Sequence, residues 1–281
     1  MIERILLALD ADADTPIATH YALDIAKRHE ARVTGLACVD TAHIESSASG
    51  GGIGSMYYAE QIKNQLTDET RQKATNLVQK FEERANEAGV NHADLVQEGV
   101  PFERILEDMK YHDLLVIGKE DHFFYADPGK NTATLERVVK ETVAPVLIIV
   151  GDYKPVKQVV IAYDGSQPAA RAMQHFAQMR PFGNDVRVRI VNVFTNEREM
   201  HEAERMCGFA QRYLESHGYT TSVAVISGED PCREVLAYSE QINADLVVAG
   251  AHSVSRVREL AFGSTTKKMI EDGTIPLFLE R

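Results

Sequence analysis

The sequence has little cysteine, and what it has is scattered. Cys38, Cys207 and Cys232 lie far apart, and they form neither a C-x-x-C pair nor a cysteine–histidine spacing of the kind that holds zinc. This pattern argues against a disulfide scaffold and against a structural metal, and it favours a reducing compartment. We therefore expect a cytoplasmic protein without a bound metal.

Long hydrophobic runs and a basic surface are also missing. No window approaches the roughly 20 apolar residues that a membrane-spanning helix needs, and the apolar run after Met1 is too short for a signal peptide because aspartates soon interrupt it. The net charge is −12, and lysines and arginines are dispersed among acids. Such a chain repels polyanions, so we expect no binding to nucleic acid or to a membrane.

What the chain does contain is a long internal repeat. Three segments of the first half recur in the same order in the second. They are Ile5-Leu-Leu-Ala-Leu-Asp10 with Val159-Val-Ile-Ala-Tyr-Asp164, His112-Asp-Leu-Leu-Val-Ile-Gly118 with Ala244-Asp-Leu-Val-Val-Ala-Gly250, and Ala144-Pro-Val-Leu-Ile-Ile-Val150 with Ile275-Pro-Leu-Phe-Leu-Glu280. A repeat of this length is a domain rather than a solenoid unit. We predict domains at 1–150 and 156–281, joined by a linker.

Within each copy, short β-branched runs alternate with helical periodicity. The predicted strands are residues 3–9, 32–39, 93–98, 114–118 and 146–150, then 157–163, 186–193, 221–226, 245–249 and 276–280. Residues 114–118 and 245–249 are continuously apolar, as in central strands of a parallel sheet covered on both faces. The predicted fold class is α/β, with two tandem doubly wound five-stranded parallel-sheet domains.

Helix starts agree with this division. Thr15-Pro16 and Ser166-Gln-Pro168 each place a hydroxyl just ahead of a proline, which the first turn of a helix tolerates. The turns at 98–101 and 227–231 each combine glycine and proline before an amphipathic run. Each of these four points is therefore predicted to open a helix.

Residues 41–58 of the first copy have no counterpart in the second. Their glycines match neither G-x-G-x-x-G after a strand nor G-x-x-x-x-G-K-[ST]. We interpret this insertion as a mobile loop that serves as a lid or binds a partner. The aromatic run at 122–125 leaves two interpretations open: an apolar ligand or partner surface, or residues tucked onto their own domain.

Candidate binding residues gather at the predicted carboxyl ends of the strands of the second copy, where such folds bind ligands. Residues 162–166 end the first strand and residues 249–253 follow the fourth. Gly250 would allow a tight turn and a close approach of ligand to the backbone. Residues 263–265 open a helix, whose free N–H groups and positive dipole end favour a phosphate.

These residues carry a resemblance to a known family. Gly250-x-x-Ser253, nine residues, then Gly263-Ser264-Thr265 is similar to the G-x-x-G-x9-G-[S/T] nucleotide motif of the universal stress protein family, and Asp164-Gly-Ser matches as well. The resemblance spans both copies and implies an adenine nucleotide alpha hydrolase-like fold that binds ATP or another adenine nucleotide, with or without Mg²⁺. In that family a strand-one aspartate contacts ribose or base, a strand-two valine lines the adenine pocket, and the glycine/serine segment holds phosphates. The residues implied for nucleotide binding are Ala162, Asp164, Val193, Ala249, Gly250, His252, Ser253, Gly263, Ser264 and Thr265.

One position of the motif departs from the family pattern. Ser253 stands where the family has its second glycine. A serine there costs about 1 kcal/mol if the position requires a positive φ. Its hydroxyl, in turn, can donate to a phosphate oxygen.

The first copy retains less of the motif. Its degenerate site keeps Asp10, Gly118 and Thr132, whereas Asn131 replaces a glycine. The acids at 120, 121 and 127 would repel a phosphate unless a cation intervened. We therefore expect no triphosphate in this crevice.

Three functions remain open from the sequence. The first is a stress-response regulatory protein in which nucleotide bound by the second copy changes loops or contacts with an unknown protein partner. The second is a slow ATPase, although no catalytic residues stand out, because phosphoryl transfer normally uses a lysine, an arginine or a carboxylate-held magnesium and both Lys267 and Lys268 are expected to face solvent. The third is a ligand-free interaction module, an internal pseudo-dimer paired through residues 146–150 and 277–280, with a homodimer possible.

Overall fold

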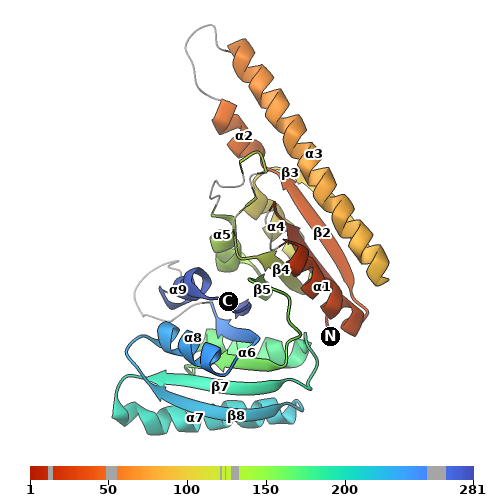
Figure 1. Ribbon diagram of the computed structural model, residues 1–281. Helices are drawn as coiled ribbons and strands as arrows, with labels where there is room; N and C mark the ends of the chain where they lie inside the picture. Colours follow the sequence, from red (N-terminus) through yellow and green to blue (C-terminus); the bar gives the residue numbers. More distant parts are fainter. Residues whose placement is uncertain (12–14, 49–55, 121, 124, 128–132, 252–263) are drawn as a thin grey trace. The chain divides into compact units, whose positions relative to one another are not determined.

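The computed structural model of the chain describes residues 1–11, 15–48, 56–120, 122–123, 125–127, 133–251 and 264–281 (Figure 1). They form two compact units. The first unit is Glu3–Glu141, and the second is Thr142–Arg281 together with Met1–Ile2. The last strand of the first repeat thus lies in the second unit. The predicted domain boundaries at 150 and 156 describe the sequence repeats, and they stay a prediction.

The first unit is a parallel sheet with helices on both faces (Figure 1). Its strands occur in the order β3-β2-β1-β4. They are β1 (Arg4–Leu9), β2 (Arg32–Val39), β3 (His92–Glu98) and β4 (Leu114–Gly118). The helices are α1 (Thr15–His29), α2 (Thr41–Ala48), α3 (Met56–Ala88), α4 (Pro101–Met109) and α5 (Thr134–Glu141).

The second unit repeats this plan and adds one strand. Its order is β5-β10-β9-β6-β7-β8, and only β5 runs antiparallel to its neighbour, with Leu277 opposite Ile148. The strands are β5 (Val146–Ile149), β6 (Gln158–Ala162), β7 (Arg187–Phe194), β8 (Thr220–Ser227), β9 (Leu246–Gly250) and β10 (Leu277–Glu280). The helices are α6 (Gln167–Met179), α7 (Glu197–Ser216), α8 (Pro231–Gln241) and α9 (Ser264–Asp272). The predicted pairing of the two final strands is confirmed.

All ten predicted strands are present, each within one residue of its predicted bounds at either end. Every residue of β4 is buried, and so are four of the five residues of β9, because helices cover both faces of a parallel sheet. None of the helices in the described part of the chain has both the length and the apolar character that crossing a bilayer requires.

The predicted helix starts are confirmed, with different caps. Ser166 caps α6 by accepting a hydrogen bond from Ala169 N, and Asp230 caps α8 by accepting from Cys232 N and Arg233 N. Thr15 is itself the first residue of α1. α4 starts at Pro101 without a side-chain cap.

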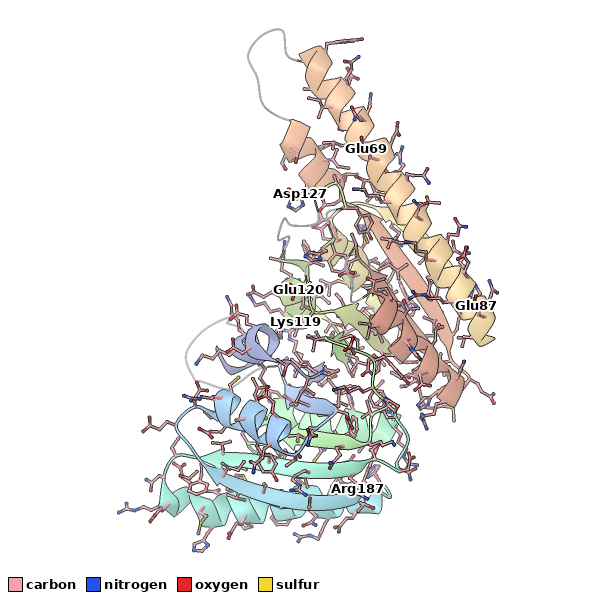
Figure 2. The ribbon with its side chains drawn as sticks, viewed as in Figure 1. Glu69, Glu87, Lys119, Glu120, Asp127 and Arg187 are labelled. Atoms are coloured by element: carbon pink, nitrogen blue, oxygen red, sulfur yellow. The ribbon has the colours of Figure 1, made fainter. Side chains whose placement is uncertain are left out.

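The interpretation of residues 41–58 as a mobile loop is wrong for its two ends. Residues 41–48 form α2, which begins after Asp40 because that carboxylate accepts from His43 N at 3.0 Å, and residues 56–58 open α3; residues 49–55 lie outside the described part. α3 has 33 residues, and its Phe81 ring packs over Gly35, where any side chain would collide with it. Much of α3 is polar and exposed, as Glu69 and Glu87 illustrate (Figure 2).

An ion pair within the second unit gives a pH-dependent contribution to stability. His175 Nδ1 of α6 lies 3.1 Å from Oε2 of Glu280, whose side chain is 7% exposed. The nearby Glu280 carboxylate raises the pKa of His175, and burial opposes this. Because the folded-state pKa is the higher one, the stabilisation is complete below the unfolded value of about 6.5 and is lost as the pH rises through the raised pKa.

We therefore expect His175→Gln to destabilise the protein more at about pH 5.5 than at about pH 8.5. The difference is small, because His175 is 41% exposed and water screens the pair. Urea unfolding of both proteins at the two pH values measures it. An equal loss of stability at both pH values would contradict the assignment.

Candidate functional site

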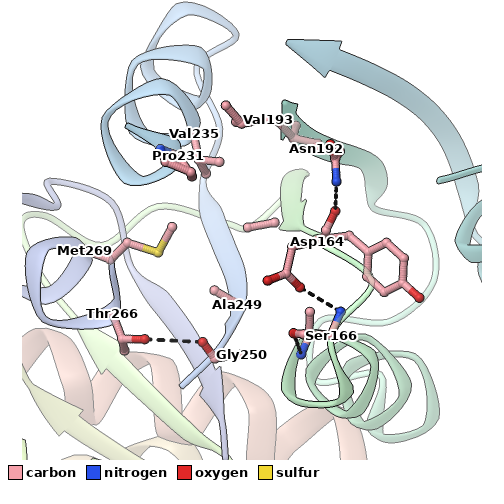
Figure 3. A pocket seen from close by; sticks show the side chains of 14 residues that line it. Asp164, Ser166, Asn192, Val193, Pro231, Val235, Ala249, Gly250, Thr266 and Met269 are labelled. Carbon is pink, nitrogen blue, oxygen red and sulfur yellow. Dashed lines mark hydrogen bonds between the residues drawn. The ribbon is translucent and has the colours of Figure 1, made fainter. Parts of the chain in front are cut away.

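A pocket lies at the carboxyl ends of β6 and β9 in the second unit (Figure 3). These strands are neighbours, and the chain leaves β6 toward β7 on the other side, so the pocket sits where the strand order reverses. The lining residues come from β6, β7 and β9, from α6, α8 and α9, and from the loop between β6 and α6. They are Ala162, Tyr163, Asp164, Ser166, Ala169, Val191, Asn192, Val193, Pro231, Val235, Ala249, Gly250, Thr266 and Met269.

Asp164 provides the charge of the pocket. It follows β6 directly, and its Oδ1 accepts a hydrogen bond from Ser166 N at 2.9 Å, which fixes the turn into α6 (Figure 3). Among the described residues, the other oxygen, Oδ2, accepts no hydrogen bond, and the side chain is exposed. One carboxylate oxygen is therefore available to hydroxyl groups of a ligand.

A backbone edge borders the pocket between β6 and β7. Asn192 Nδ2 donates to Tyr163 O at 2.8 Å (Figure 3), and Tyr163 N donates to Val191 O. Alternate residues of a parallel strand address the same neighbour, so the N–H of Val193 points toward β6 as the carbonyl of Val191 does. Among the described residues, neither Tyr163 O nor any other group accepts a hydrogen bond from the Val193 N–H. This N–H is a free donor at the pocket wall.

Apolar side chains form the opposite wall. Pro231 and Val235 come from α8 and Met269 from α9, with Ala249 between them at the end of β9 (Figure 3). Val235 and Met269 are almost completely buried. A flat aromatic ring with polar atoms on one edge fits this part of the pocket. Its faces would be shielded from water, and its polar edge would meet the backbone of β7.

α9 begins beside the pocket. Ser264 and Thr265 are its first residues, and Thr266 lines the pocket, with its hydroxyl donating to Gly250 O at 3.4 Å. The first turn of a helix has free N–H groups. Lys267 and Lys268 are exposed as expected, and they pair with Glu271 and Asp230.

The structure gives Gly250 a role that the sequence did not suggest. A Cβ on Gly250 would lie 2.6 Å from Ala169 N and from Pro168 C. The missing side chain therefore makes room for the first turn of α6. Gly250 also lines the pocket, and the close approach of a ligand to its backbone stays a prediction.

Five of the ten predicted nucleotide-binding residues line this pocket: Ala162, Asp164, Val193, Ala249 and Gly250. Ser264 and Thr265 open the helix beside it, whereas His252, Ser253 and Gly263 lie outside the described residues. Sequence reasoning missed the pocket residues of α8, Pro231 and Val235, and those farther along α9, Thr266 and Met269, and it also missed Asn192. That asparagine is the only polar residue in the run 190–194, a signal that was available.

Among the residues of the first unit that the structure describes, Asp10 is not placed as Asp164 is. This carboxylate is fully buried and bonded to the Thr15 hydroxyl. Gly118 ends β4, and Thr132 lies outside the described residues. Glu120 and Asp127 are exposed, as Figure 2 shows.

For residues 122–125, two interpretations were open: an apolar ligand or partner surface, or packing against their own domain. The structure supports packing against the domain for Phe123 and Tyr125. Phe123 and Tyr125 are buried, with exposures of 1% and 0%. They are therefore not available as an apolar partner surface.

Comparisons with known proteins agree on one family. The model of the Universal stress protein family matches residues 1–149 and again residues 155–279. Universal stress protein Slr1230 of Synechocystis sp. is 26% identical over 246 residues, which covers 85% of this chain and 84% of that protein. A universal stress protein from Archaeoglobus fulgidus is similar in structure with a TM-score of 0.71 at 19% identity, covering 99% of this chain and 98% of its own. PA1789 from Pseudomonas aeruginosa PAO1, a protein of unknown function, gives 0.64 at 14% identity, with coverage of 99% and 92%. These matches confirm the predicted fold of two tandem domains.

Proposed function

The chain belongs to the universal stress protein family, and from that premise we propose that its second unit binds ATP or a related adenine nucleotide in the pocket at the ends of β6 and β9. One observation carries the proposal. A single pocket combines an apolar slot, a free backbone N–H on Val193 and a free carboxylate oxygen on Asp164. These are complementary to a purine base and a ribose.

The base is proposed to lie between β7 and the apolar side chains of α8 and α9. There the N–H of Val193 would donate to a ring nitrogen, and the apolar walls would exclude water from both faces of the ring. Asp164 would accept hydrogen bonds from the ribose hydroxyls through Oδ2. Hydrogen bonds to a charged acceptor are worth about 1.5–3 kcal/mol each.

The phosphates are proposed to bind at the start of α9. Ser264 and Thr265 open this helix, whose first N–H groups and positive dipole end favour an anion. The motif residues Gly263 and Ser253 would complete this part of the site. Among the described residues, no group of three or more His, Cys, Asp or Glu side chains is placed to hold a metal ion.

A nucleotide titration tests the proposed function. Native mass spectrometry of the gently purified full chain would show any adenine nucleotide that co-purifies. Calorimetric titration of the stripped protein with ATP and magnesium would then give the affinity and the stoichiometry, expected at one nucleotide per chain. No heat of binding at millimolar ATP would refute the proposal.

Asp164→Ala is expected to weaken ATP binding by about 10- to 100-fold, because the ribose loses its charged acceptor. Asp164→Asn keeps an oxygen for Ser166 N but lacks the charge, so it separates the turn from the ribose contact. Asp152→Ala, an equal change at an exposed residue, is the matched control. An unchanged dissociation constant in Asp164→Ala would exclude the proposed ribose contact.

A second candidate function is an interaction module without a ligand. The antiparallel pairing of β5 with β10 favours it, because this contact joins the final strands of the two repeats within one sheet. Both candidates predict a folded protein, but only the first predicts saturable nucleotide binding.

A further inference from the structure

The two repeats offer the same pair of backbone groups at the ends of their first two strands. In the second unit these groups are Tyr163 O and Val193 N. The sequence repeat aligns Leu9 with Tyr163, and the strand registers, Ala8 opposite Leu36 and Ala162 opposite Val191, align Cys38 with Val193. The corresponding groups of the first unit are therefore Leu9 O and Cys38 N.

In the first unit one side chain satisfies both groups. The Tyr125 hydroxyl donates to Leu9 O and accepts from Cys38 N at 3.2 Å. The ring is completely buried, and burial raises the pKa of Tyr125 well above its usual value. The hydroxyl thus stays protonated and keeps both hydrogen bonds.

The backbone around Tyr125 is held from two sides. Lys73 of α3 donates to Tyr125 O at 2.6 Å, and Ala11 N donates to His122 O at 3.2 Å. Phe123 is buried beside it in the chain. Lys73 belongs to the long helix of the first repeat, so the element that follows the insertion helps to hold the aromatic segment.

We propose that Tyr125 is a built-in ligand: its phenol ring fills, in the first unit, the binding crevice that is open in the second unit. The crevice selects an aromatic ring that carries a hydrogen-bond donor and acceptor on one edge. Tyr125 is then the residue that prevents a free ligand of this class from entering the first unit.

The test removes the Tyr125 side chain by substitution and supplies its phenol ring as free phenol in solution. In the full chain, Tyr125→Ala is expected to bind one more equivalent of phenol than the wild type, in which only the crevice of the second unit is open, and to gain thermal stability from it. Benzene, which lacks the hydroxyl, is expected to bind about tenfold more weakly, because two hydrogen bonds are missing. Tyr111→Ala, the same change at an exposed tyrosine, is the control and should bind no more phenol than the wild type.

Two results would overturn the proposal. One is a cooperatively folded Tyr125→Ala protein that binds no more phenol than the wild type, and the other is equal affinity of the additional site for benzene and phenol, which indicates a plain apolar cavity. If Tyr125→Ala does not fold, Tyr125→Phe decides: the Cys38 amide should exchange its hydrogen at least tenfold faster while the Val33 amide does not, and unchanged exchange at Cys38 refutes the proposal. No nucleotide is used, so the outcome is independent of the proposed function of the second unit.

Discussion

Gly250→Ala is expected to lower the free energy of unfolding of the second unit by about 1–3 kcal/mol, the usual cost of overpacking, and to abolish detectable nucleotide binding. The new Cβ would lie 2.6 Å from backbone atoms of Pro168 and Ala169. Backbone cannot rotate away as a flexible side chain can, so the first turn of α6 must move. Asp164 and Ser166 lead into that turn, and the proposed ribose contact moves with it.

Urea unfolding and ATP titration of Gly250→Ala measure these two effects. Gly208→Ala is the matched control, because Gly208 lies inside α7 and an added Cβ there meets only the tip of Arg212, at 3.8 Å. In a helix this change gains about 0.5–1 kcal/mol. The same chemical change is thus expected to act in opposite directions, and a Gly250→Ala protein of wild-type stability would contradict the structure.

Phe176→Ala is expected to cost about 3–5 kcal/mol of stability, a large part of the 5–15 kcal/mol typical of a folded domain. Phe176 belongs to α6, and its side chain is completely buried. Its ring stacks on Tyr219 and meets the edge of Phe278, each with centroids 5.8 Å apart. Without the ring, α6 loses its contacts with Tyr219 and Phe278. The packing of the helix that positions Ser166 and Ala169 is then weakened.

Thermal unfolding checks this loss, with Phe209→Ala as the control. Phe209 is 57% exposed on α7, where its ring contacts only the Arg212 guanidinium among the ring contacts described. Surface changes of this kind usually stay within about 0.5 kcal/mol. Equal effects of the two substitutions would show that Phe176 does not anchor α6.

The strands could be predicted because burial leaves a strong pattern in the sequence. β4 and β9 are continuous apolar runs, and the repeat located each of them twice. The helical ends of the insertion escaped prediction because a glycine run dominates its composition, whereas α2 and α3 are fixed by particular contacts such as the Asp40 cap and the packing of Phe81 on Gly35. Such contacts are invisible until the partner strand is in place.

The candidate site likewise has a part that the sequence predicts and a part that it does not. Asp164 follows β6 and Val193 lies at the end of the neighbouring strand β7, so topology alone brings them together. The role of Gly250 depends on how closely α6 approaches β9, and the role of Tyr125 depends on groups 87 and 116 residues away in the chain. Local patterns carry no information about such distances.

The occupied crevice of the first unit has a consequence for how the two halves respond to their surroundings. By mass action, a site that fills from solution stabilises its unit by about 2.7 kcal/mol at 100 times the dissociation constant and by nothing when ligand is absent. Tyr125 is part of the chain, so its occupancy of the crevice does not depend on the concentration of any free ligand. Under the proposed function, nucleotide depletion therefore lowers the stability of the second unit alone. The stability of the first unit does not depend on the nucleotide concentration.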